Sequence, residues 1–118
     1  MYKTLFPLLL ICNTAIAAHN EHRPVCSPDG SQLIYMQQSE RTDNDWELYL
    51  LEIETQVQSR LTTHPGWDGY AVWSPEGNHI IFDREDAPDT GKRPWIMDLN
   101  NRVSKPLGSY EGWVSVSD

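Results

Sequence analysis

The feature that most constrains this chain is an internal repeat. Residues 27–30 read Ser-Pro-Asp-Gly and residues 74–77 read Ser-Pro-Glu-Gly, so the motif returns after 47 residues. The match continues downstream, where residues 33–35 (Leu-Ile-Tyr) correspond to residues 80–82 (Ile-Ile-Phe). A period of roughly 20 to 50 residues is typical of solenoids and propellers. The sequence is therefore interpreted as copies of one structural unit.

The second half of the unit also recurs. Residues 49–53 (Tyr-Leu-Leu-Glu-Ile) correspond to residues 95–99 (Trp-Ile-Met-Asp-Leu) after a one-residue gap. Residues 68–72 (Asp-Gly-Tyr-Ala-Val) correspond to residues 111–115 (Glu-Gly-Trp-Val-Ser). The chain thus contains two nearly full copies and the opening of a third.

The sequence of each copy predicts four short strands that are joined by tight turns. In the Ser-Pro-Asp/Glu-Gly motif, Pro presets the second turn position and Gly closes the turn. Runs rich in β-branched and aromatic residues on either side indicate strands, expected at residues 32–37, 47–53, 57–61 and 71–73. Four strands per repeat is the unit of a β-propeller blade. The predicted fold is all-β: two four-stranded antiparallel blades and the start of a third, hence an incomplete propeller.

The repeat boundaries divide the chain. The first blade is expected at about residues 25–66, the second at about 67–110 and a stub at 111–118, together spanning residues 25–118. Residues 18–24 are expected to form a flexible N-terminus. Residues 33–36 and 48–51 are apolar at successive positions, which predicts middle strands covered on both faces.

Residues 1–17 resemble a secretory signal peptide. Lys3 is the only charge, residues 5–11 are apolar, and residues 15–17 (Ala-Ile-Ala) supply small residues at a cleavage-type spacing. This predicts export to the periplasm, with no membrane insertion after cleavage. A lipoprotein is an alternative because Cys12 follows an apolar run, although the preceding Ile11 is larger than usual there.

Cleavage after Ala17 would leave Cys26 as the one cysteine of the mature chain. Two readings remain for its thiol. Cys26 stands at the repeat position of Trp73, which favours a small buried hydrophobe. Pairing with another chain is the alternative.

Composition excludes some functions. The chain has 9 Lys+Arg against 17 Asp+Glu, with a net charge of −8. Nucleic-acid binding requires clustered basic residues, so no nucleic-acid partner is expected. Anionic lipid surfaces would repel the chain for the same reason.

No catalytic residues or cofactors are predicted. A Gly-x-Ser-x-Gly nucleophile motif does not occur; residues 108–112 have a different spacing. Residues 43–47 resemble the start of a calcium loop but lack its Gly and distal Glu, so a solvated hairpin loop is expected. Residues 83–86 are interpreted as an exposed strand end. His19 and His22 could bind copper or nickel with a free amine, but a polar terminus is favoured, and no metal site is predicted.

Specific residues resemble the WD-like repeat of the TolB propeller family. They are residues 73–77, 80–82 and 95–99, with the Arg-Leu-Thr ending at 60–62; the first copy has Cys26 where the family usually has Trp. This resemblance implies a non-enzymatic interaction module of the bacterial periplasm, like TolB of the Tol–Pal system. Similar repeats form the propeller of prolyl-oligopeptidase-type peptidases, so a truncated peptidase propeller is the alternative.

The connection between blades is the predicted recognition surface. Such connections lie on one rim of a propeller, and exposed aromatic residues favour protein interfaces. The candidate partner-binding residues are His64, Trp67, Asp68, Tyr110, Glu111 and Trp113. Two blades also leave open apolar faces, which predicts self-association. A trimer would complete a six-blade ring, and as a further alternative that ring would be a small ligand-binding assembly.

Overall fold

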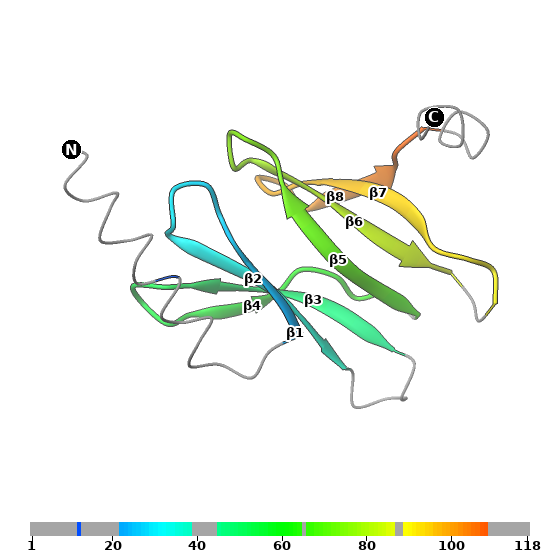
Figure 1. Cartoon of the computed structure of the whole chain (residues 1–118), viewed down its shortest axis with the longest axis horizontal. Helices are drawn as coiled ribbons and strands as arrows, with labels where there is room; N and C mark the ends of the chain where they lie inside the picture. The colour runs from blue at the N-terminus through cyan, green and yellow to red at the C-terminus, as the bar shows by residue number, and fades with distance from the viewer. Residues whose placement is uncertain (1–11, 13–21, 39–44, 65, 87–88, 109–118) are drawn as a thin grey trace.

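The computed structural model describes residue 12 and residues 22–38, 45–64, 66–86 and 89–108. The strands are β1 (His22–Cys26), β2 (Gln32–Gln38), β3 (Trp46–Glu52), β4 (Gln58–Arg60), β5 (Trp67–Trp73), β6 (His79–Glu85), β7 (Arg93–Asp98) and β8 (Val103–Pro106). They form two four-stranded antiparallel units, β1–β4 and β5–β8, called here the N-terminal and C-terminal sheets (Figure 1). A single parallel bridge, Trp46 to Trp67, connects them. The chain is an all-β, partial propeller, as predicted.

Strand register confirms the repeat. Cys26 pairs with Leu33 in the N-terminal sheet, and Trp73 pairs with Ile80 in the C-terminal sheet. These are the positions that the sequence match equates. The inner strand of the second copy is longer than predicted, since β5 begins at Trp67 rather than at residue 71.

The Ser-Pro-Asp-Gly turn is held by its own side chains. The Ser27 hydroxyl donates to Asp29 Oδ1 at 2.8 Å, and both the Ser31 amide and hydroxyl donate to the same oxygen. These hydrogen bonds, with the Ser31 amide first, lower the pKa of Asp29. Gly30 has φ of 78°, in the left-handed region that favours glycine. The turn therefore fixes how β1 returns into β2.

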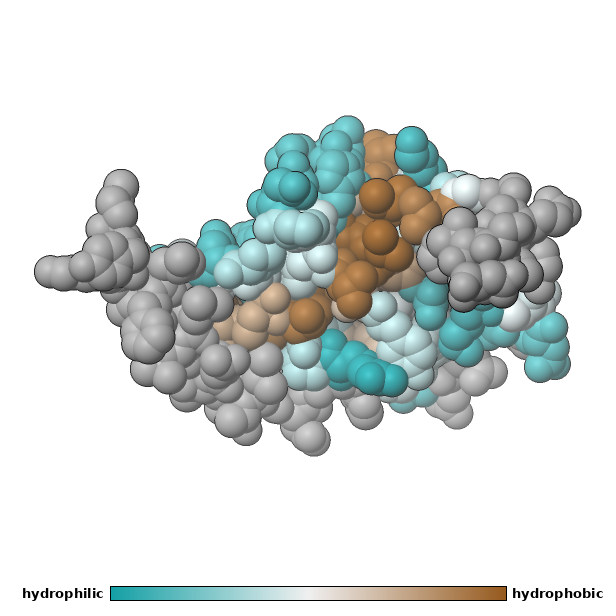
Figure 2. Space-filling model, turned by 45° about the horizontal axis from the view of Figure 1, so that its top comes forward, coloured by the Kyte–Doolittle hydropathy of each residue, from teal (hydrophilic) through white to brown (hydrophobic). Residues whose placement is uncertain are grey.

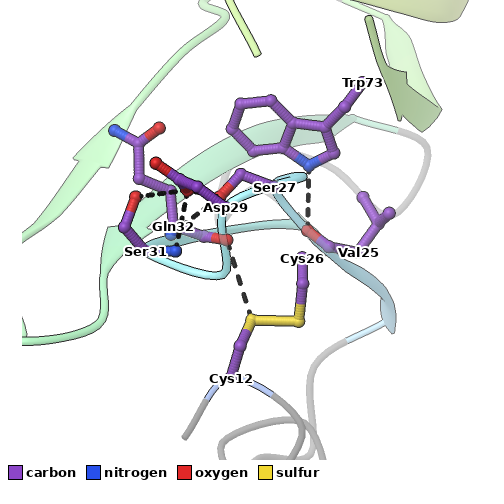
Figure 3. The surroundings of a disulfide bond; sticks show 8 residues. All are labelled: Cys12, Val25, Cys26, Ser27, Asp29, Ser31, Gln32 and Trp73. Carbon is purple, nitrogen blue, oxygen red and sulfur yellow. Dashed lines mark hydrogen bonds between the residues drawn. A yellow bond between two sulfur atoms is a disulfide. The ribbon is translucent and has the colours of Figure 1, made fainter. Parts of the chain in front are cut away.

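The main core lies between the two sheets. Its buried side chains come from both sheets: Ile34, Met36, Leu48, Leu50, Leu61, Ala71, Ile80, Phe82 and Met97. Gly69 allows this close packing, because a Cβ there would lie 2.8 Å from Met36 Sδ. The Trp73 indole N–H also donates to the Val25 carbonyl at 3.1 Å, which ties the inner strands of the two sheets together (Figure 3).

A second core covers the other face of the N-terminal sheet. It comprises Cys12, Leu33, Tyr35, Leu51 and Ile53, with Cys26 and Tyr49 packed against it. The prediction that the middle strands are buried on both faces is confirmed for this sheet, where Leu33, Ile34 and Tyr35 are at most 1% exposed.

The prediction for Cys26 is wrong. Its sulfur forms a disulfide with Cys12, and the Cys12 sulfur also contacts the Gln32 carbonyl at 3.7 Å (Figure 3). Cys12 lies within the predicted signal peptide, so it was not expected to be available to pair with Cys26. Cys26 is only partly buried, and its sulfur is half of a disulfide rather than a free thiol.

Residues 83–86 also differ from the prediction. Most of this segment continues β6, and Arg84 is only 9% exposed. Alternate residues of β6 face the main core, which places Arg84 on the same side as Ile80 and Phe82. The segment is thus partly internal.

Candidate protein-interaction rim

The connection from β4 to β5 is fastened to β3 by hydrogen bonds. The Leu61 amide donates to the Leu48 carbonyl at 2.8 Å, and the Leu48 amide donates to Thr62 Oγ1 at 2.9 Å. The Thr62 hydroxyl in turn donates to Glu47 Oε2 at 2.7 Å. These hydrogen bonds hold the first residues of the connection in a fixed position beside β3.

Glu47 is a fully buried carboxyl beneath this connection. Burial raises its pKa to about 7, opposed by the Thr62 hydrogen bond and by the charge of Arg60. Arg60 Nη2 lies 3.3 Å from Glu47 Oε1, and Arg60 Nε donates to the Thr62 carbonyl. The carboxyl thus links the end of β4 to β3.

Asp68 and Arg84 form a buried ion pair at the start of β5. Arg84 Nε and Nη2 donate to the two oxygens of Asp68 at 2.8 and 3.1 Å. The guanidinium lies over the Trp95 ring, 4.4 Å from its centre. A two-point pair of this kind fixes orientation as well as distance. It locks β5 against β6 next to the connection from β4.

His64 extends this polar cluster toward solvent. Its Nε2 lies 3.3 Å from Asp86 and its Nδ1 lies 3.9 Å from Asp68. The Nδ1 atom is buried without a hydrogen-bond partner among the described residues. His64 therefore stands between a buried carboxylate and an exposed one, at the outer edge of the connection.

Trp67 lies in a row of cations and rings. Lys92 Nζ sits 4.5 Å from the centre of the Trp67 ring, and the Tyr70 ring meets Trp67 edge-on at 4.8 Å. Arg23 in turn lies 4.3 Å over the Tyr70 ring. Cation–π contacts of this type hold aromatic side chains in place at a surface. The row runs from the β6–β7 loop across β5 to β1.

We call the exposed or half-buried residues of this region the rim: Arg23, His64, Trp67, Tyr70, Asp86 and Lys92. Three of the predicted residues, His64, Trp67 and Asp68, lie at the connection from β4 to β5. Asp68, however, is 0% exposed, so its carboxylate serves the fold and is not presented at the surface. Tyr110, Glu111 and Trp113 lie outside the described residues.

Sequence reasoning missed Arg23, Asp86 and Lys92. Arg23 precedes the repeat, and residues 86 and 92 flank a loop that has no counterpart of matching sequence in the first copy. The charge signs alone do not show that Lys92 would reach back to Trp67. Tyr70 is 43% exposed.

Two kinds of feature are absent from the described ranges. No group of three His, Cys, Asp or Glu residues there is placed to hold a metal ion. Within the same ranges, no helix has the length and apolar character needed to cross a membrane.

Two solved structures share this architecture. TolB from Acinetobacter baumannii matches with a TM-score of 0.60 and 24% identity, covering 73% of this chain and 20% of that one. A protein described as TolB from Agrobacterium tumefaciens matches with a TM-score of 0.63 and 19% identity, covering 77% and 32%. The chain therefore spans less than a third of those proteins. At these identities the likeness establishes the fold alone, a partial β-propeller similar to TolB. No protein-family model matches the chain.

Proposed function

We propose that the protein is an exported, non-enzymatic interaction module of the bacterial periplasm, which binds a protein partner through the rim. The observation that carries the proposal is the row formed by Lys92, Trp67, Tyr70 and Arg23. Trp, Tyr and Arg are the residue types that contribute most to protein interfaces. In this row they are already ordered, so binding would cost little side-chain entropy.

The buried polar cluster supports this role. Asp68, Arg84 and Glu47 are all at most 9% exposed, and their bonds fix the connection that carries His64 and Trp67. Charged groups used in this way position the surface. They favour a rigid recognition site over a catalytic one, in which reactive groups would face an open cleft.

Export is supported by the signal-type pattern of residues 1–17 and by the resemblance to TolB, which belongs to the periplasm. The net charge of −8 favours a protein partner with basic groups, since opposite charge speeds association.

Photocrosslinking from the rim tests this proposal. A photoreactive amino acid replaces Lys92 or Asp86, and the protein is illuminated in its host cells. Controls carry the same group at Glu76 or Asn101, exposed turn residues of the same sheet. We expect one discrete protein adduct from the rim positions, identified by mass spectrometry. Equal labelling from the rim and the turns, or no adduct, would refute a binding role for the rim.

A further inference from the structure

Because the two sheets are copies of one repeat, each face of the N-terminal sheet has a corresponding face in the C-terminal sheet. Leu33 pairs with Leu51 in the N-terminal sheet, and Ile80 pairs with Met97 at the same place in the C-terminal sheet. Ile80 and Met97 point into the main core, against the N-terminal sheet. Leu33 and Leu51 therefore belong to the face of the N-terminal sheet that corresponds to the packed face of the C-terminal sheet. We call Leu33, Tyr35, Leu51 and Ile53 the outer face.

The opposite faces correspond in the same way. The row Val25, Ile34 and Leu50 of the N-terminal sheet packs in the main core, with Ile34 and Leu50 buried. Its counterpart in the C-terminal sheet is the row Val72, Ile81 and Ile96, called here the open face.

The open face is apolar and accessible. Val72 is 54% exposed, and Ile81 and Ile96 are only partly buried. Apolar side chains gather on the side of the molecule where the C-terminal sheet lies (Figure 2). In the internal interface, the residues at these positions are covered by the next sheet. A contiguous apolar surface of this kind marks an interaction site.

We propose that the open face of one chain binds the outer face of a second copy, repeating between chains the interface that already joins the two sheets within one chain. The established internal interface is the template, because each face of the new contact has its repeat counterpart buried there. The contact is head to tail, so it uses two different surfaces and can close into a ring.

Cys12 occupies the outer face. It is 0% exposed within the second core and is bonded to Cys26 (Figure 3). A second copy can bind there only after Cys12 has left, which requires opening of the disulfide; a chain break after residue 12 then lets the segment that carries Cys12 dissociate. This inference uses a different surface from the rim, so it stands or fails independently of the proposed partner.

The test uses the full-length protein and breaks, one at a time, the two connections that hold Cys12: the peptide chain and the disulfide. A site for a specific protease is placed between Ala17 and Ala18, and the purified chain is cut, with or without reductant. Gel filtration with light scattering measures the mass. We expect a monomer after cutting alone, because the disulfide retains Cys12, and a dimer or larger closed assembly after cutting and reduction. A monomer after both steps, or association before reduction, would overturn the proposal.

Two valine variants test the face itself. In the cut and reduced chain, Val72→Glu should abolish association, whereas Val57→Glu, at a similarly exposed valine just before β4, should not. Equal behaviour of the two variants would contradict the assignment.

A crosslink distinguishes specific binding from aggregation of a trimmed chain. Within one chain, Trp73 contacts the Val25 carbonyl. Cys26 is the counterpart of Trp73, and Val72 is the counterpart of Val25. Position 72 of one copy should therefore lie beside Cys26 of the next. With Val72→Cys, a short bis-maleimide should join position 72 to Cys26 between isotopically labelled and unlabelled chains. The same yield from Val57→Cys would show non-specific association.

Discussion

Arg84 donates two hydrogen bonds to Asp68, at 2.8 and 3.1 Å, and the two residues are directly paired across β5 and β6. Both side chains are buried, and Asp68 has no exposed surface. The pair places β5, and with it Trp67, in a fixed position next to the connection from β4. The position of Trp67 within the rim therefore depends on this buried contact.

Removing the charge of one partner of this pair should lower the free energy of unfolding strongly. Asp68→Asn leaves the Arg84 charge buried without its counterion, and we expect a loss of about 3–5 kcal/mol in the free energy of unfolding. Urea unfolding followed by tryptophan fluorescence measures it. The double variant Asp68→Leu with Arg84→Met removes both charges and should recover most of the loss. A single variant as stable as the parent would contradict a structural role for the pair.

Glu47 should make stability depend on pH. Its pKa is about 7 in the folded protein, above its ordinary value of 4.5, because burial disfavours the charged form. Between these values the folded state binds more protons than the unfolded state, so the free energy of unfolding falls as pH rises from about 4.5 to 7.

The matching variant is Glu47→Gln, which keeps an acceptor for the Thr62 hydroxyl but cannot ionise. Relative to the parent, it should gain stability between pH 5 and pH 8. Urea midpoints at the two pH values give the comparison. A difference between variant and parent that stays constant with pH would show that Glu47 does not titrate in this range.

Any side chain at position 66 in place of Gly66 should destabilise the protein. Its φ is 140°, and a Cβ there would lie 2.6 Å from the Glu85 carbonyl oxygen, while its own carbonyl accepts the Trp46 amide. Gly66→Ala should therefore destabilise the protein by about 1–3 kcal/mol through forced displacement of the backbone.

Gly91→Ala is the control for backbone conformation alone. Gly91 also has a positive φ, of 86°, but no atom lies within 4 Å of its Cβ position. Its cost should be smaller, about 1 kcal/mol. Thermal unfolding of the two variants side by side tests the difference. Equal melting temperatures would mean that the Glu85 contact has no influence.

The sequence predicted the fold because a repeat constrains register. Residues 27–30 and 74–77 form equivalent turns, and the structure places the pairs Cys26–Leu33 and Trp73–Ile80 at equivalent positions beside them. The middle strands were found for a similar reason, since runs such as residues 33–36 are apolar at every position and must be covered on both faces.

The polar contacts could not be found in the same way. Arg84 was placed at an exposed strand end because its neighbours are charged, although alternation with Ile80 and Phe82 puts it on the buried face, opposite Asp68. That alternation was the available signal. The Lys92 contact with Trp67 depends on the path of a loop, and no pattern in the sequence encodes that path. The disulfide was missed because Cys12 was assigned to a cleaved signal peptide before its pairing with Cys26 was considered.

The intact mass of the protein recovered from the periplasmic fraction of its host tests the central claim, that this partial propeller is an exported module, most directly. An exported module should be recovered as a chain that begins at Ala18, with Cys26 reactive toward a thiol reagent once the disulfide to Cys12 has been reduced. A full-length chain in the cytoplasmic fraction, beginning at Met1, would contradict export and the periplasmic interaction role together.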